Sequence, residues 1–114
     1  MSREPNDKSE LTKGVPVDLI NHISYAEGSV VSKTLVHKET GTLTLFAFDT
    51  GQGLSEHTAP FDAIVQILDG LAEITLGGKK VSVKTGELII MPANIPHAVH
   101  APEKFKMLLT MIRA

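Results

Sequence analysis

The sequence contains no cysteine, and its formal net charge is only −2 at pH 7. Without cysteine the chain can form no disulfide framework, no thiolate metal site and no cysteine nucleophile. Its 11 Lys and Arg residues against 13 Asp and Glu residues give no excess of positive charge, which nucleic acids and anionic membranes require of a partner. We therefore expect neither a nucleic acid nor a membrane as a partner.

Long apolar runs are also missing. No run approaches the roughly 18 residues of a membrane-spanning helix, and the N-terminal residues MSREPNDKSELTKG lack the apolar core of a signal peptide. The absence of cysteine agrees with a reducing compartment. These features predict a soluble protein located in the cytoplasm.

The chain has 114 residues, which is the size of one domain. Residues 1–14 carry six charged side chains, and Leu11 is their one large aliphatic side chain. Such a segment has too little apolar surface to offset the entropy that it would lose on ordering. We predict a flexible N-terminal tail over residues 1–14 and a single folded domain over residues 15–114.

The folded part has the pattern of β-strands. Short segments rich in Val, Ile, Thr and Leu alternate with Gly, Pro and Asn, and no helical period extends over three turns. Apolar and polar side chains alternate in residues 71–76, and Gly77 and Gly78 predict a tight hairpin into residues 79–84. The other predicted strands are residues 18–25, 29–38, 41–50, 52–57, 61–69, 87–91, a strand starting at His97, and 105–112. About ten short strands predict an all-β barrel or jelly roll, because closure removes exposed sheet edges.

Some predicted strands are apolar on both faces, among them residues 42–48 and residues 105–112. Such a strand fills a barrel with one face and has the other face covered by a second layer or by a partner. One barrel interior cannot hide all of this apolar surface. The surplus predicts a homodimer.

Residues 51–70 and residues 86–101 contain the side chains that could carry chemistry. In the second segment, Gly86, Pro92 and His97 have the spacing of the second conserved motif of the cupin superfamily, and the first segment resembles the first cupin motif in its spacing and its closing turn. The resemblance covers nearly all of the folded part and is closest to short bacterial single-domain cupins. It implies a cupin-type double-stranded β-helix, which is a jelly-roll barrel around a cavity.

The family resemblance also implies a metal site, and here the sequence departs from the family pattern. Metal-binding cupins present two His one residue apart, then a Glu, then the His of the second motif. His57 and His97 fit the first and last of these positions, whereas Ala59 and Ala63 replace the second His and the Glu. A mononuclear site generally takes three protein ligands. His57 and His97 are therefore an incomplete ligand set for a divalent transition metal.

Four further side chains are candidates to complete that ligand set: Glu56, Asp62, Gln66 and His100. Strand alternation turns Gln66 away from the face of Ala63, and His100 is three residues from His97, which puts it on the opposite face. None of the four is favoured. Three roles therefore stay open for His57 and His97, namely metal ligation, contact with an organic ligand, and a structural hydrogen bond.

We predict that ligand-binding residues line the barrel cavity: His57, His97, Met91, Phe48 and Met107, with Phe46 as an alternative to Phe48 and with Met111 as a further lining residue. The predicted function is binding of a small organic ligand by a single-domain cupin. The alternative is a metal-dependent cupin enzyme, an oxygenase or an isomerase, that uses His57 and His97. No catalytic residue is assigned, because neither a nucleophile turn nor a carboxylate pair is present. No cofactor is assigned either, and a divalent transition metal is the one candidate.

Overall fold

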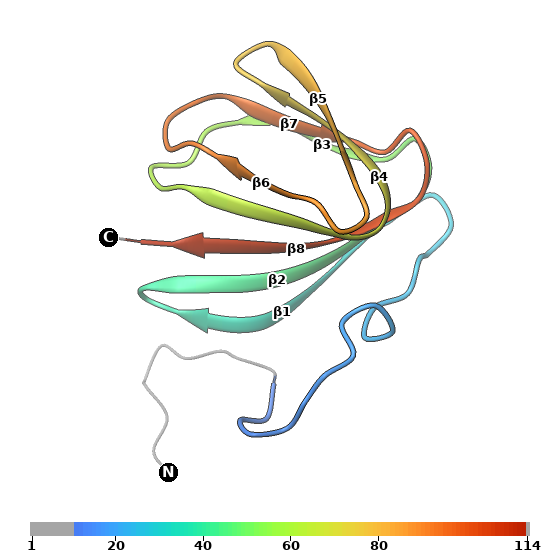
Figure 1. Ribbon diagram of the computed structural model, residues 1–114, viewed down its shortest axis with the longest axis vertical. Helices are drawn as coiled ribbons and strands as arrows, with labels where there is room; N and C mark the ends of the chain where they lie inside the picture. The colour runs from blue at the N-terminus through green and yellow to red at the C-terminus, as the bar shows by residue number, and fades with distance from the viewer. Residues whose placement is uncertain (1–10, 114) are drawn as a thin grey trace.

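The computed structural model describes residues 11–113, which form eight β-strands joined by turns and loops (Figure 1). None of these residues forms a helix that could span a membrane. The strands are β1 (Val30–Lys38), β2 (Gly41–Phe48), β3 (Gly53–His57), β4 (Ala63–Leu76), β5 (Lys79–Lys84), β6 (Leu88–Met91), β7 (His97–His100) and β8 (Phe105–Ile112). Residues 1–10 of the predicted tail lie outside the described residues. Leu11, which belongs to the predicted tail, packs against the outer face of the sheet.

The strands form one curled antiparallel sheet in the order β1-β2-β8-β4-β7-β3, and β5 and β6 also pair with β4. The first half of β4 pairs with β8 and β6, whereas its second half pairs with β5 and β7. Figure 1 shows the sheet curving around one interior, with β1, β2 and β8 on one side and β3, β5 and β7 on the other. The predicted all-β jelly-roll architecture is confirmed.

The predicted hairpin is confirmed as well. β4 and β5 pair in register from Leu76 opposite Lys79 to Leu71 opposite Lys84. Both residues of the turn, Gly77 and Gly78, have positive φ angles. A two-residue turn of this kind matches the twist of the strands that it joins.

Gly70 joins two predicted strands into one. The sequence predicts separate strands over residues 61–69 and residues 71–76, but Gly70, with a φ of +86°, bends the chain inside β4 without ending it. The pairing with β8 shifts near this bend, between Ile67 and Asp69. Buried side chains have odd numbers before the bend and even numbers after it, as in the core residues Ala63, Val65, Ile67, Ala72 and Ile74. The bend therefore keeps the apolar side of both halves facing the interior.

Residues 18–25 form a turn at residues 19–22 and irregular chain around it, so the strand predicted there is wrong. Their apolar side chains cover the outer face of the sheet, where Ile23 is buried beside Leu35. A side chain of the sheet binds their backbone in place of a neighbouring strand, since the Nζ of Lys106 donates to the carbonyl of Ile20 at 2.6 Å. This segment is the second layer that the strands with two apolar faces require.

The covering layer leaves part of the outer face open. Leu88 and Ile90 on β6 are 53% and 52% exposed. The homodimer expected from the sequence stays a prediction, and these two side chains are part of the surface that it would cover.

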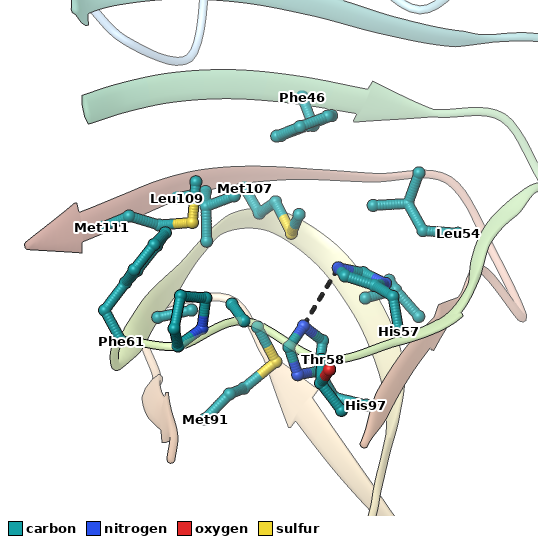
Figure 2. Close-up of a pocket in the computed structure, with 14 residues that line it drawn as sticks. Phe46, Leu54, His57, Thr58, Phe61, Met91, His97, Met107, Leu109 and Met111 are labelled. Atoms are coloured by element: carbon teal, nitrogen blue, oxygen red, sulfur yellow. Dashed lines mark hydrogen bonds between the residues drawn. The ribbon is translucent and has the colours of Figure 1, made fainter. Parts of the chain in front are cut away.

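Aromatic side chains fill one end of the interior. Phe48 is fully buried and stacks between Phe46 and Phe105, with ring centroids 5.8 Å and 4.4 Å away. Farther along β8 the inward side chains Met107, Leu109 and Met111 surround open space (Figure 2). The fold therefore has a packed end and a hollow end.

Candidate functional site

The hollow end is a cavity of about 350 Å³ (Figure 2). Its polar side chains, His57, Thr58 and His97, gather on one side. The remaining lining residues are apolar: Phe46, Leu54, Ala59, Pro60, Phe61, Ala63, Met91, Val99, Met107, Leu109 and Met111. Small-molecule sites range from about 300 to 1,000 Å³ and combine an apolar lining with a few polar groups. The cavity has the size and lining of a site for a small ligand.

The cavity contains most of the residues predicted to line it. Met91 and Met107 line it, but Phe48 does not, because it is packed between two other rings in the filled end of the interior. Phe46, which lies two residues earlier on the same face of β2, lines the cavity in its place. Leu109 was not predicted, although strand alternation from Met107 places it on the same face of β8.

His57 and His97 lie side by side at the ends of β3 and β7. The two residues are register partners in the antiparallel pair, just after a register shift that separates Leu54 from His57. Their Nε2 atoms are 3.1 Å apart, and their ring planes are inclined at 69°. His97 is buried, with 3% of its surface exposed, whereas His57 is exposed. His97 is therefore the buried member of the pair in the cavity wall, and His57 is the member that also contacts solvent.

The turn before His97 is fixed to the loop that follows His57. Asn94 has a φ of +65°, and its backbone N–H donates to the carbonyl of Ala59 at 2.7 Å. The neighbouring N–H of Ala93 donates to the Oδ1 of Asp62 at 2.9 Å. The Asp62 carboxylate therefore orders this turn. Because these bonds join both histidine-bearing segments, they hold the two imidazoles at a defined separation.

Burial is the largest influence on His97 and lowers its pKa below the ordinary value of 6.5. The hydrogen bond with the Ile95 carbonyl raises this pKa, and the neighbouring His57 lowers it, but the net direction is downward. His97 is therefore neutral in the folded protein at neutral pH.

This lowered pKa predicts that acid weakens the fold. The unfolded chain takes up a proton at His97 as the pH falls below about 6.5, whereas the folded chain does so only at lower pH. The contribution of neutral His97 to the free energy of unfolding is therefore fully present above pH 6.5 and is lost as the pH falls through the lowered pKa. We expect the urea midpoint of unfolding to fall between pH 7 and pH 5, and we expect a smaller fall in His97→Gln. The exposed His100→Gln variant is the control, and an identical pH profile in all three proteins would contradict this origin.

The donor atoms at this site do not fit the mononuclear metal centre that the family resemblance implies. Ala59 and Ala63 line the cavity beside the two histidines and offer no donor atom. Within residues 11–113 no group of three or more His, Cys, Asp or Glu side chains is placed to hold a metal ion. The candidates proposed to complete the set lie elsewhere: Glu56, Gln66 and His100 are exposed, and Asp62 binds the Ala93 N–H. Two imidazole nitrogens alone fall short of the three ligands that such a site takes.

Comparison with known proteins finds one matching family and several similar structures. Residues 44–113 match the cupin domain family. A conserved protein of unknown function from Streptococcus pyogenes is 38% identical, with a TM-score of 0.87, and the match covers 100% of this chain and 96% of that one. A cupin 2 conserved barrel domain protein from Leptotrichia buccalis is 44% identical, with a TM-score of 0.83 over 85% of this chain and 47% of that one.

A third similar structure is a cupin superfamily protein from Desulfitobacterium hafniense. It is 29% identical, with a TM-score of 0.85, and the match covers 91% of this chain and 95% of that one. No curated protein matches the chain.

Proposed function

The chain belongs to the cupin domain family, and from that premise we propose that it binds a small, largely apolar organic molecule in the cavity of its barrel. The observation that carries this proposal is the cavity of about 350 Å³, whose lining is apolar apart from one polar side. The cupin fold by itself warrants no particular chemistry, because one fold supports many functions. The lining of the cavity is what favours an organic ligand.

The composition of the lining favours a ligand that presents apolar surface on most sides. Met91, Met107 and Met111 come from two strands and face the same space (Figure 2). Methionine side chains are flexible and polarisable, so they adapt to an irregular apolar ligand and make favourable contacts with aromatic rings. Phe46 and Phe61 add aromatic surface to the lining. An aromatic or alicyclic molecule fits this environment best.

The alternative function, a metal-dependent oxygenase or isomerase, has less support from the residues present. Such a reaction needs a metal held firmly while substrate takes up open positions. Here two of the four family ligand positions are Ala59 and Ala63, which cannot coordinate. The same two alanines enlarge the apolar wall of the cavity. The substitutions that remove the metal ligands therefore favour the binding function.

Binding is tested with small probes and methionine methyl signals. We expect ethylbenzene and 4-ethylphenol to shift the NMR signals of the Met91, Met107 and Met111 methyl groups in a saturable way, because all three line the cavity. Leu109→Phe fills part of the cavity and should weaken binding by about tenfold, a loss of about 1.4 kcal/mol. Leu108→Phe is the matched control, since Leu108 packs on the outer face.

Adding atoms to a packed region costs about 1 to 3 kcal/mol of stability. Thermal unfolding is therefore measured for both variants to check that each is folded. If neither probe moves the methionine signals of the wild-type protein, the proposed function is wrong. If Leu108→Phe weakens binding as much as Leu109→Phe, the ligand does not occupy the cavity.

A further inference from the structure

The hydrogen bonds of His57 and His97 define where each ring carries its proton. The Nδ1 of His57 lies 2.8 Å from the carbonyl of Ser55, and the Nδ1 of His97 lies 3.2 Å from the carbonyl of Ile95. A carbonyl oxygen can only accept a hydrogen bond, so each Nδ1 must carry the hydrogen. In a neutral imidazole the other nitrogen is then a bare acceptor. Both Nε2 atoms therefore present lone pairs.

These two lone pairs lie close together without satisfying each other. The Nε2 atoms are 3.1 Å apart, a hydrogen-bond contact that requires a hydrogen on one of them. When both rings are neutral and both hydrogens are on Nδ1, neither ring has a hydrogen to place there. The ring centroids are only 4.3 Å apart and the planes are inclined at 69°, so the rings do not meet head-on. Figure 2 shows both rings at the polar side of the cavity, with the Nε2 atoms turned toward one another. A donor beside both nitrogens would satisfy the two acceptors together.

Apart from the two histidines, the described lining has few polar groups that could donate to those acceptors, and it carries no charged side chain. Thr58 contributes the one other polar side chain among the residues that line the cavity, and no Lys, Arg, Asp or Glu is among them. A carboxylate would place negative charge against two lone pairs. An ammonium group would lose its hydration in an apolar space. A neutral donor avoids both costs.

We infer that the ligand is a neutral alcohol or phenol whose hydroxyl group donates to the facing Nε2 atoms of His57 and His97, while its apolar body fills the methionine-lined cavity. This inference rests on the proposed function, because it names the class of the molecule that the cavity binds. In this inference the two histidines recognise the hydroxyl group through their Nε2 atoms. Removing one of these acceptors should therefore change the relative affinities for different ligands more than it changes the stability of the protein.

The test compares 4-ethylphenol with 4-ethylanisole, which has nearly the same shape but carries a methyl group on the oxygen. Affinities are measured from the methionine methyl signals at pH 8, above the ordinary imidazole pKa of about 6.5. We expect the wild-type protein to bind 4-ethylphenol about tenfold more tightly than 4-ethylanisole. In His57→Phe this ratio should fall clearly below tenfold but stay above one, because the hydroxyl hydrogen keeps only the Nε2 of His97 as an acceptor. His57 is exposed, so the variant should fold.

His100→Phe is the matched control. His100 is an exposed histidine on β7 that lies outside the cavity lining, so its substitution should leave the tenfold ratio unchanged. Equal affinities for the phenol and the ether in the wild-type protein would overturn the inference and leave the proposed function standing. Tighter binding of 4-ethylbenzoate than of 4-ethylphenol would also overturn it. Binding of none of these probes would overturn both.

Discussion

Replacing Gly70 with alanine is expected to destabilise the protein by at least about 3 kcal/mol. Gly70 lies at the bend of β4 with a φ of +86°, a conformation that costs an L-residue about 1 to 2 kcal/mol. A Cβ atom at this position would also lie 2.0 Å from the carbonyl oxygen of Lys104, which is far inside van der Waals contact. Because that oxygen is part of the backbone, the clash cannot be relieved by turning a side chain.

Gly86→Ala separates the two contributions. Gly86 has almost the same φ, +88°, but an added Cβ would meet no atom within 4 Å. This control should lose only the conformational cost of about 1 to 2 kcal/mol. Urea unfolding of the two variants and the wild-type protein measures the difference, and the melting temperature of Gly70→Ala should fall by roughly 10 °C or more. Equal losses in the two variants would show that the backbone at Lys104 yields easily, against this prediction.

Restoring the two missing ligands is expected to create a metal site. In the double variant Ala59→His and Ala63→Glu, both new side chains start from positions that line the cavity beside His57 and His97. The chain would then carry three imidazoles and one carboxylate, a donor set that suits a divalent transition metal. We expect the affinity for Zn²⁺ or Ni²⁺ to rise at least about a thousandfold over the wild-type protein, equivalent to about 4 kcal/mol.

Calorimetric titration of each protein with Zn²⁺ measures this gain. Because Ala63 is buried, the new carboxylate should weaken the apo fold, and added metal should restore the urea midpoint, since a ligand that binds only the folded state stabilises it. The same double substitution combined with His57→Ala is the control and should lose most of the gain. Wild-type protein that binds Zn²⁺ as tightly as the double variant would contradict the interpretation that the alanines remove the metal site.

The sequence predicted features that depend on neighbouring residues. Alternation in residues 71–76 and the Gly77–Gly78 pair predicted the hairpin between β4 and β5, because a period of two and a positive φ are local properties. The same reasoning placed a separate strand at residues 18–25 and was wrong. Apolar residues there suit a strand, but the outer face of β1 and β2 buries them without any backbone ladder. That outcome depends on residues far along the chain.

Phe46 and Phe48 show a second limit of sequence reasoning. Both lie on β2 two residues apart, so alternation places them on the same inner face. Phe48 is sealed against Phe105, whereas Phe46 reaches the cavity. Their different roles depend on the pairing of β2 with β8, which sets Phe48 opposite Phe105. Strand parity gives the face of a residue but not its depth in the barrel.

Local periodicity, turn residues and motif spacing were enough to predict the all-β class, the hairpin and the family resemblance, and they singled out His57 and His97 as candidate site residues. The contact between their Nε2 atoms at 3.1 Å could not be predicted from the sequence, because the two rings are 40 residues apart in the chain and meet through a register shift in the pairing of β3 with β7. Register is a property of the folded sheet, and a shift of one residue would turn either imidazole away from the cavity.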